Sequence, residues 1–380
     1  MKKIISDEKL QNAISYISGK TLANLSDFTY KYPASASVNN IYPQTDNVSW
    51  TTSFYTGMLH LSYQKTKDER FEEAAAIHTK DFARRLKERI DLGNHDIGFL
   101  YTLSCVGAYK IKKDEFAKET AIKAANLLLD RYIEKAGVIH CWGDMEGCTE
   151  YARIIVDCLL NLPLLYWASE ATGDDKYKKA AYTHAKNTQK YIIRPDKSTY
   201  HSYIFSVKTG LADHGETVQG FADNSCWSRG QAWGIYGFML SYLYTGDKSF
   251  IETACELLDY FLSHLPEDHV PYWDLYFQSG NEERDSSAAA ITACGIIEIL
   301  KALDESDPRR DKYTQALSDI LNSLIDNYMT TPDTASNGIL LHGVYGKPQN
   351  NGIDECLIWG DYFFLEALMR LDNPKLEIMW

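Results

Sequence analysis

A helical unit recurs along this 380-residue chain, and its recurrence constrains the fold more than any other feature. Each copy has a polar or aromatic loop, an apolar helix rich in Gly, Ala and Tyr, an acidic turn, and a charged amphipathic helix. The copies span residues 50–86, 95–132, 152–192, 228–265, 284–328 and 359–380. Repeats of this kind stack so that neighbours bury one another's apolar faces. The chain is therefore expected to be all-α, with a single domain over residues 1–380.

The last copy, 359–380, ends before its second helix, whereas a spare amphipathic segment, 6–28, lies near the other end of the sequence. If that N-terminal segment completes the last pair, six helix hairpins close into an (α/α)6 barrel. The apolar first helices would then line the inside and the charged second helices would form the outer layer. An open helical solenoid is the alternative, and the short sixth copy favours closure.

In a closed barrel the loops that precede the inner helices meet at one end, where they would build a single binding site. Functional side chains recur in or near those loops. They are Trp50, His95, Asp96, Trp142, Asp157, His201, Gln219, Trp227, Arg229, Trp233, Arg284, Asp285, Trp359, Asp361 and Tyr362. The aromatic content of 13%, with 26 Tyr and 8 Trp, suits either a large core or a site that stacks on sugar rings.

Asp157 stands out because it is one acid in an apolar run, "ARIIVDCLLNLPLLYWA". Burying an unpaired carboxylate costs several kcal/mol, so the residue needs an explanation. Three explanations fit the residue: a helix N-cap, the partner of Arg153 one helical turn away, or a catalytic acid whose proton is held by its apolar surroundings. The residues alone leave these three readings open.

Composition and charge exclude several classes of protein. The net charge of -13 disfavours a nucleic-acid partner, which needs a basic face. No run of about 18 apolar residues occurs, and the first residues lack the apolar stretch of a signal peptide, so we expect no membrane segment and a cytoplasmic location. The eight cysteines are scattered and the ten histidines form no ligand motif, which indicates reduced thiols and predicts neither a catalytic metal nor a cofactor.

Five segments, "HDIGFLY", "RIIVDCLLNLPLLYWA", "RGQAWGIYGF", "DSSAAAITACG" and "IWGDYFFLEAL", resemble the unsaturated glucuronyl hydrolases of glycoside hydrolase family 88. The resemblance follows the same order along nearly the whole chain. It implies an (α/α)6 barrel that acts on oligosaccharides left by polysaccharide lyases. Such an enzyme releases the 4,5-unsaturated uronic acid from the non-reducing end, glycosaminoglycan fragments included, by hydrating the C4=C5 vinyl ether.

The resemblance also implies roles for individual residues. Asp157 matches the family's general acid/base and Asp96 its partner carboxylate, whereas Asp285 and Asp361 are expected to be structural or capping residues. The expected substrate-binding residues are Trp50, His95, Trp142, His201, Gln219, Trp227, Arg229, Trp233 and Lys347.

Two segments depart from the family pattern. The sequence "TVQG" places Val218 where the family has a histidine. In the segment before "IWGD", Gly343 and Gly346 replace expected hydroxyl side chains, although Lys347 is present. We expect Lys347 to serve an outer, sulfate-dependent subsite, and Arg229 to be able to grip a carboxylate through two parallel hydrogen bonds.

Three other functions compete with this interpretation. An unsaturated rhamnogalacturonyl hydrolase would use the same hydration on pectin fragments. An ordinary inverting glycosidase would need two carboxylates about 6.5–9.5 Å apart. A non-catalytic barrel that binds glycans or proteins would need the aromatic residues but not Asp96 and Asp157. For single residues the plainer roles are a helix cap for Asp96, a surface loop for His201, a structural ion pair for Arg229, and core packing for Trp233.

Overall fold

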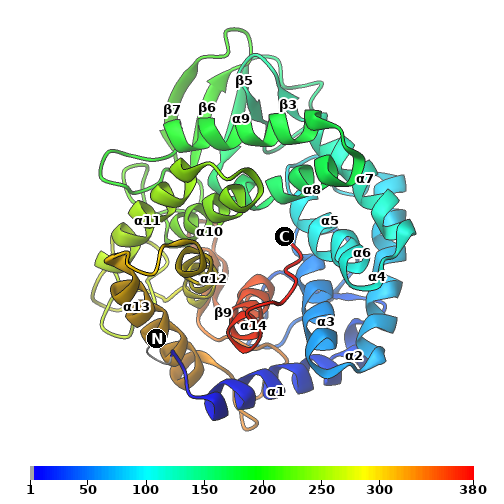
Figure 1. Cartoon of the computed structure of the whole chain (residues 1–380), viewed down its shortest axis with the longest axis vertical. Coiled ribbons are helices and arrows are strands. Elements are labelled where there is room, and N and C mark those ends of the chain that lie inside the picture. The colour runs from blue at the N-terminus through cyan, green and yellow to red at the C-terminus, as the bar shows by residue number, and fades with distance from the viewer. Residues whose placement is uncertain (1–3) are drawn as a thin grey trace.

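The computed structural model describes residues 4–380, whose helices form a closed (α/α)6 barrel (Figure 1). The inner layer consists of α3 (Thr52–Thr66), α5 (Ile97–Tyr101), which continues through a wider turn, Thr102–Val106, into α6 (Gly107–Lys112), α8 (Leu162–Thr172), α10 (Ser228–Thr245), α12 (Ser286–Ala302) and α14 (Ile358–Asp372). The outer layer consists of α4 (Glu69–Glu88), α7 (Glu115–Leu129), α9 (Asp175–Tyr191), α11 (Lys248–Ser263), α13 (Arg309–Ser323) and α1 (Asp7–Ala23). A single turn of helix, α2 (Leu25–Phe28), follows α1.

The predicted closure of the ring is confirmed. The last inner helix, α14, packs between α12 and α3, and α1 lies against both α14 and α3. The N-terminal helix thus supplies the outer helix that the sixth copy lacks. Figure 1 shows the first and last helices of the chain side by side in the ring.

The acidic turns of the repeat fold as paired helix caps. Where the inner helix ends, Lys67, Lys113, Gly173 or Gly246 takes the left-handed conformation. The aspartate that follows accepts a hydrogen bond from a main-chain N–H in the first turn of the outer helix; these aspartates are Asp68, Asp114, Asp174 and Asp247. One dipeptide therefore stops one helix and starts the next, which explains the recurrence of the turn along the sequence.

Burial differs between the two layers as the repeat predicts. Every residue of α10 from Ser228 to Ser241 is buried, and so is every residue of α12 from Ser286 to Ile299. The outer helix α4, by contrast, buries one apolar stripe and leaves charged residues in solvent. Within residues 4–380 no helix is long and apolar enough to cross a membrane.

The segment around Asp157 was expected to begin an inner helix, and this expectation is wrong. Residues Tyr151–Ile155 form strand β5, a 3-10 turn (Val156–Leu160) follows, and α8 begins only at Leu162. The strand pairs with β6 (Ser202–Ser206), which pairs with β7 (Ala212–Glu216), so hydrogen bonds from a distant segment replace those of a helix. Local apolar spacing cannot distinguish a short buried strand from a helix.

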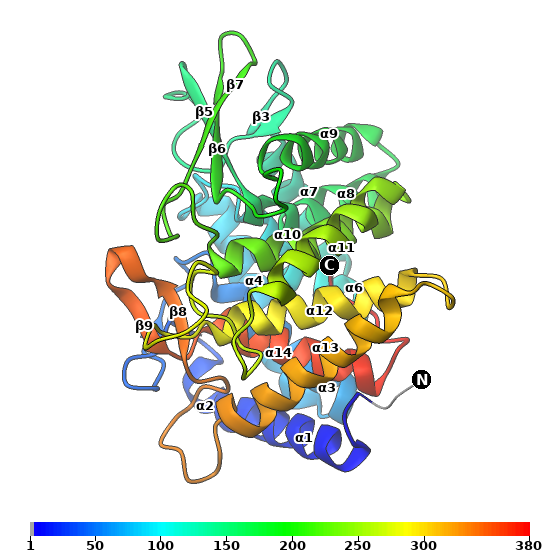
Figure 2. The same cartoon turned by 90° about the vertical axis from the view of Figure 1, so that its left-hand side faces the viewer.

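Other short strands lie at the same end of the barrel. They are β1 (Tyr32–Pro33) with β2 (Gln44–Thr45), β3 (Tyr132–Ile133) with β4 (Val138–Ile139), and β8 (Gly343–Gly346) with β9 (Asn351–Glu355). Figure 2 shows the β5–β6–β7 sheet and the β8–β9 hairpin projecting from one end, while short helix-to-helix turns form the other. The loops before the inner helices therefore share one end, as the repeat predicts.

Trp380 closes the interior from the opposite direction. Its ring stacks on Phe363 at 5.7 Å and meets Phe99 edge to face at 5.9 Å. Its indole N–H donates to the buried carboxylate of Glu366 at 2.8 Å. Phe99 lies three residues after Asp96, so the ring of Trp380 supports the helix that carries one of the expected catalytic residues.

Replacing Trp380 with Ala should therefore lower the free energy of unfolding by about 3–5 kcal/mol, the range for truncating a buried aromatic residue. The change opens a cavity and leaves Glu366 without its indole donor. Chemical denaturation measures the loss, with Tyr30→Ala as the control because Tyr30 is an exposed aromatic residue. A loss no larger than that of the control would show that the interior does not depend on this ring.

Candidate active site

Asp157 lies directly after β5, in the first turn of the 3-10 segment Val156–Leu160. The main-chain N–H of Val156 donates to the carbonyl oxygen of His201 at 3.1 Å, which ties the end of the strand to β6. The flanking residues Val156 and Cys158 are fully buried, whereas the side chain of Asp157 keeps 17% of its surface exposed. The apolar neighbours thus anchor the backbone in the core while the carboxyl group of Asp157 stays partly exposed.

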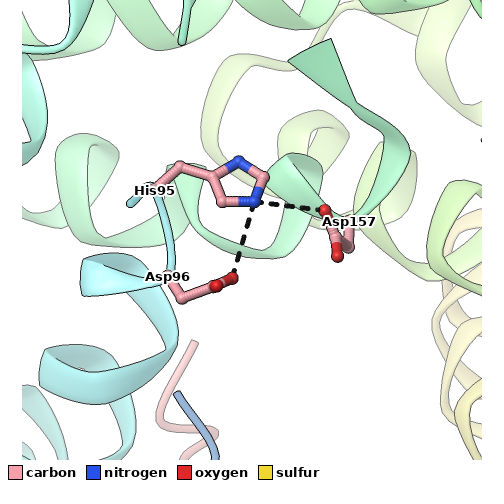
Figure 3. A group of neighbouring side chains, drawn as sticks. All are labelled: His95, Asp96 and Asp157. Atoms are coloured by element: carbon pink, nitrogen blue, oxygen red, sulfur yellow. Dashed lines mark ion pairs between the residues drawn. The ribbon is translucent and has the colours of Figure 1, made fainter. Parts of the chain in front are cut away.

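His95 lies between the two expected catalytic carboxylates (Figure 3). Its Nε2 atom is 3.5 Å from Oδ1 of Asp96 and 3.4 Å from Oδ1 of Asp157. Asp96 precedes α5 but its side chain makes no capping hydrogen bond, so the carboxylate is not used to hold the helix. The structure therefore brings together an imidazole and two carboxyl groups from two successive repeats.

A close backbone contact between two repeats holds Asp96 and Asp157 near each other. A Cβ atom on Gly98 would lie 2.3 Å from Cα of Asn161, so α5 approaches the Asp157 segment more closely than a side chain would allow. The amide oxygen of Asn161 accepts a hydrogen bond from the N–H of Phe99 at 2.6 Å, and its Nδ2 lies 3.5 Å from Oδ1 of Asp96. On the other side, a Cβ on Gly237 would lie 2.3 Å from Cβ of Leu159. Two glycines thus let α5 and α10 clamp the segment that carries Asp157.

The electrostatics of the pair favour a retained proton. Burial raises the pKa of Asp157 well above its ordinary value, and the neighbouring carboxylate of Asp96 raises it further. Burial also raises the pKa of Asp96, although the hydrogen bond from Asn161 opposes that shift. Burial lowers the pKa of His95, so the imidazole between the acids is neutral and does not compensate a second negative charge. The two carboxyl groups are therefore expected to share one proton near neutral pH.

The cation that the sequence offered as the partner of Asp157 lies elsewhere. Arg153 is on a strand rather than a helix, and its Nη2 pairs with Oε1 of Glu216 on β7 at 2.6 Å. Its guanidinium also lies 5.5 Å from the ring centroid of Trp142. Of the three explanations left open for Asp157, a helical contact with Arg153 is therefore not the one found, because Arg153 lies on β5 and Asp157 on the 3-10 segment after it.

Arg229 lies at the start of α10 and is almost fully buried. Its Nη1 pairs with Oδ2 of Asp285 at 2.7 Å, and its guanidinium also donates to the main-chain oxygens of Val344 and Tyr345. The positive charge lowers the pKa of Asp157 and is the main charge opposing the effect of Asp96. The Nη groups that the sequence assigned to a substrate carboxylate thus already have protein partners.

His201 is buried at the end of the loop before β6, rather than exposed on a surface loop. Its Nδ1 accepts hydrogen bonds from the main-chain N–H groups of Val218 at 2.9 Å and Gln219 at 3.3 Å. The proton of the neutral ring therefore resides on Nε2, which has no protein partner. At position 218, where the sequence departs from the family, the main chain makes the contact, and this contact is independent of the side chain.

Tyr345, on β8, connects several expected substrate-binding residues, and sequence reasoning missed it. Its hydroxyl accepts a hydrogen bond from Nε1 of Trp50 at 2.8 Å, and its main-chain oxygen accepts one from Nε2 of Gln219 at 2.9 Å. The same oxygen accepts from Arg229. An aromatic residue in the loop before the last inner helix was the available signal, because loops at that place in the repeat carry the other site residues.

The remaining predicted residues divide between the barrel end and the core. Trp227 is buried beside the site, with its ring 4.7 Å from that of His201 and under the guanidinium of Arg229. Trp142 is half-exposed and its backbone bridges to Asn94, next to His95. Trp233 is buried and packs against Phe99 and Phe363.

The two acids expected to be structural have structural contacts. Asp285 caps α12 by accepting the main-chain N–H of Ser287, in addition to its pair with Arg229. Asp361 accepts hydrogen bonds from the main-chain N–H groups of Ile339 and Leu340 and from the hydroxyl of Tyr42. Both carboxylates are thus fully engaged within the protein.

Lys347 has two acidic partners that the sequence did not predict. Its Nζ pairs with Oε2 of Glu282 at 2.6 Å and also with Glu283. It lies 5.6 Å from the ring centroid of Trp273, whose Nε1 donates to the same carboxylate of Glu282. Two carboxylates against one ammonium leave this part of the barrel end negative rather than positive.

The group of side chains drawn in Figure 3 is also the one place in the described residues where three potential metal ligands converge. One ligand atom from each of His95, Asp96 and Asp157 lies within 4.8 Å of the others. Imidazole nitrogen and carboxylate oxygen are ligands that suit several divalent cations. The expectation that no metal is needed stays a prediction, which the activity of chelator-treated protein would test.

Comparison with known proteins places this site in a family. The model of Glycosyl Hydrolase Family 88 matches residues 26–364. An unsaturated chondroitin disaccharide hydrolase of Streptococcus pneumoniae is 43% identical over 97% of this chain and 93% of its own length. An unsaturated glucuronyl hydrolase of a Bacillus species is 43% identical over 96% of this chain and 97% of its own. The chain is therefore a glycoside hydrolase, and it belongs to family 88.

Solved structures agree with the fold. The crystal structure of an unsaturated glucuronyl hydrolase from Streptococcus agalactiae superposes with a TM-score of 0.96, at 42% identity, covering 99% of this chain and 94% of that one. A second structure, with a TM-score of 0.91 at 42% identity over 96% of this chain and 97% of that one, carries the four-sugar ligand dGlcA-Glc-Rha-Glc. The all-α barrel predicted from the repeat is thus the fold of these relatives.

The raised pKa of Asp157 predicts a pH-dependent stability. The unfolded chain releases this proton at a pH of about 3.9, whereas the folded chain holds it to higher pH. The contribution of this group is therefore fully present below about pH 4 and is lost as pH rises through the folded-state pKa. Asp157→Asn cannot ionise, so its free energy of unfolding relative to wild type should rise between pH 4 and pH 8, by about 1.4 kcal/mol per unit of raised pKa.

Urea denaturation at the two pH values measures this difference, with Asp333→Asn, an exposed acid, as the matched control. The control should show no such trend. A difference for Asp157→Asn that is constant with pH would mean that the folded protein does not hold the proton.

Proposed function

We propose that this protein releases the 4,5-unsaturated uronic acid from the non-reducing end of oligosaccharides produced by polysaccharide lyases, glycosaminoglycan disaccharides above all. The observation that carries the proposal is the buried pair of Asp157 and Asp96, which can hold one proton beside a neutral His95. Relatives that match nearly the whole chain are named for this reaction on chondroitin disaccharides.

The proposed chemistry needs one proton donor that can later act as a base. The protonated carboxyl of Asp157 gives its proton to C4 of the double bond, and the positive charge that develops at C5 is stabilised by the ring oxygen. Water adds at C5 while the carboxylate of Asp157 takes one of its protons, which restores the starting state. The resulting hemiketal opens by itself and expels the remainder of the oligosaccharide.

Within this scheme Asp96 and His95 act on the acid rather than on the substrate bond. The negative charge of Asp96 keeps the pKa of Asp157 high enough for a proton to be available. The close approach of Gly98 to Asn161 and the hydrogen bond from Asn161 to Asp96 keep the two carboxyl groups together. A neutral His95 lets the like charges repel, because a protonated imidazole would lower the pKa of both acids.

The geometry argues against an ordinary inverting glycosidase. Such an enzyme needs its two carboxyl groups about 6.5–9.5 Å apart, so that water fits between one of them and the sugar. Here the nearest oxygens of Asp96 and Asp157 lie within 4.8 Å of each other. A non-catalytic glycan-binding barrel is also disfavoured, since binding alone gives no reason to bury two carboxylates together at a cost in stability.

Substrate preference is the finer part of the proposal. Because Lys347 is paired with Glu282 and Glu283, we propose that it does not supply a free positive charge to a sulfate, in contrast to the expectation from its position in the sequence. Unsulfated fragments are then the preferred substrates. A pectin-derived substrate for an unsaturated rhamnogalacturonyl hydrolase differs only in the next sugar, and assays with pure disaccharides separate the two.

The proposed cellular location is the cytoplasm. All eight cysteines are unpaired and seven of them are buried, as is typical of a protein in a reducing compartment. We propose that no cofactor takes part, because hydration of the vinyl ether needs only proton transfer and water.

The reaction is tested by incubating the protein with unsaturated disaccharides from chondroitin, hyaluronan, heparin and pectin and following the ultraviolet absorbance of the conjugated double bond. Wild type should remove that absorbance. Asp157→Asn should lower kcat by at least about 10²-fold, because an amide keeps the shape of the acid but cannot donate its proton. A folded Asp157→Asn variant with near wild-type turnover would refute the assignment of the acid, and intact absorbance with wild type on every substrate would refute the reaction.

The pairing of Lys347 predicts a change in selectivity. Glu283→Gln removes one of its two carboxylate partners and lowers the local negative charge. The ratio of kcat/KM for a sulfated over an unsulfated chondroitin disaccharide should rise by at least about tenfold, the low end for one hydrogen bond to a charged group. Glu305→Gln, at an exposed position on the far turns of the barrel, is the control. A ratio unchanged from wild type would show that the glutamates do not limit sulfate binding.

A further inference from the structure

Two exposed aromatic rings lie stacked on each other outside the residues considered so far. Phe221 and Tyr276, here called the aromatic platform, are 52% and 66% exposed. Their ring centroids are 5.2 Å apart and their planes differ by 21°. Phe277 meets Phe221 edge to face from the side, at 5.1 Å. The platform therefore forms a contiguous exposed aromatic surface, unlike the single apolar residues that are commonly scattered over a protein surface.

A buried carboxylate holds both rings in place. Asp274 is fully buried, and it accepts hydrogen bonds from the main-chain N–H of Phe221 at 2.9 Å and of Tyr276 at 3.0 Å. It also accepts from the side chain of Ser225 and the N–H of Cys226. One acid thus ties together the loop before α10 and the loop before α12. The platform is ordered before any ligand arrives, which reduces the entropy cost of binding.

The platform is continuous with the candidate active site. Phe221 lies two residues after Gln219, which bonds to the main-chain oxygen of Tyr345. Trp273 lies 6.3 Å from Phe221 edge to face, and the ammonium of Lys347 lies over the ring of Trp273. Figure 2 shows the segments that join β7 to α10 and α11 to α12 at the same end of the barrel as the β8–β9 hairpin. An oligosaccharide whose first ring lies beside Asp157 can therefore extend outward over the platform.

The neighbouring charges indicate what kind of group the platform accepts. Lys347 is already paired with Glu282 and Glu283, so the nearby charge is balanced or negative. An anionic group is disfavoured there, whereas the apolar C–H face of an uncharged sugar ring suits a flat aromatic surface. The amide groups of Gln219 and Gln349 are held in the adjoining loops by bonds to Tyr345 and Val218.

We propose that Phe221 and Tyr276 form an outer subsite, which binds a sugar ring of the leaving group beyond the ring next to the cleaved bond. The inference rests on the proposed function, because the unsaturated ring must lie beside Asp157 for the rest of the oligosaccharide to extend outward. A relative crystallised with a four-sugar ligand is a precedent for the length of chain involved. The subsite adds binding energy for longer substrates whose outer sugar ring is uncharged, alongside the disaccharides that the proposed function names.

The test compares the unsaturated disaccharide dGlcA-Glc with the tetrasaccharide dGlcA-Glc-Rha-Glc, whose sugars beyond the unsaturated ring are all uncharged. In Phe221→Ala/Tyr276→Ala the ratio of kcat/KM for the tetrasaccharide over the disaccharide should fall about tenfold from its wild-type value, mainly through KM. Loss of stacking on an aromatic ring accounts for an effect of this size. Tyr182→Ala is the matched control, since Tyr182 is a 37% exposed aromatic residue on the outer helix α9 and should leave the ratio unchanged.

Binding measured by calorimetry in the Asp157→Asn background tests the platform without turnover, and so separates its failure from failure of the proposed reaction. The tetrasaccharide should bind about tenfold more weakly after Phe221 and Tyr276 are replaced. An unchanged ratio of tetrasaccharide to disaccharide, in binding and in kinetics, would overturn the proposal. So would a dimer in sedimentation velocity that dissociates when the platform is removed, because the rings would then form an interface between copies of this chain.

Discussion

The structure depends on the burial of its inner helices on every side. In α10 and α12 fourteen consecutive residues have no solvent-facing position, so neither helix can lie at the edge of an open stack. The apolar residues find cover only if the ring closes, with α14 between α12 and α3 and with α1 outside. Closure has a functional consequence, because it brings the loops before the inner helices to one end of the barrel.

The buried charged groups at the two ends of the barrel interior differ in the partners they have. Deep in the barrel, Arg370 pairs with Glu298 at 2.7 Å and with Glu366 at 2.5 Å, and Trp380 supplies a further hydrogen bond to Glu366. Each buried charge in that network lies beside an opposite charge, as stability requires. At the other end Oδ1 of Asp157 and both ring nitrogens of His95 lack hydrogen-bond partners. The uncompensated groups mark the place where substrate and water complete the site.

The cations around the site form ion pairs with acids of the protein, so they hold the loops together and do not offer free charge to an anion. Arg153 pairs with Glu216, Arg229 with Asp285, and Lys347 with two glutamates. An anionic uronic acid therefore meets paired charges and neutral donors. His201 is one such donor, because its Nδ1 is occupied by main-chain N–H groups and its Nε2 proton is free. Recognition by neutral donors is compatible with a strongly acidic protein and with an acid/base whose pKa must stay high.

Much of the fold was determined by the sequence itself. The paired caps, such as Gly246 with Asp247, stop and start helices through local hydrogen bonds, so the repeat and the ring could be predicted from spacing. The two acids could be singled out by their place in the repeat and by resemblance to family 88. These features depend on residues close together in the sequence, where periodicity carries the information.

Other features were decided by tertiary structure alone. The strand before Asp157 exists because β6, some fifty residues later, pairs with it, and that pairing directs Arg153 to Glu216. The glutamates at Lys347 are more than sixty residues away in the sequence, and the link from Tyr345 to Trp50 spans most of the chain. The close approach of Gly98 to Asn161 likewise joins two different repeats. Contacts between distant segments depend on how the helices pack, and no local pattern of residues encodes them.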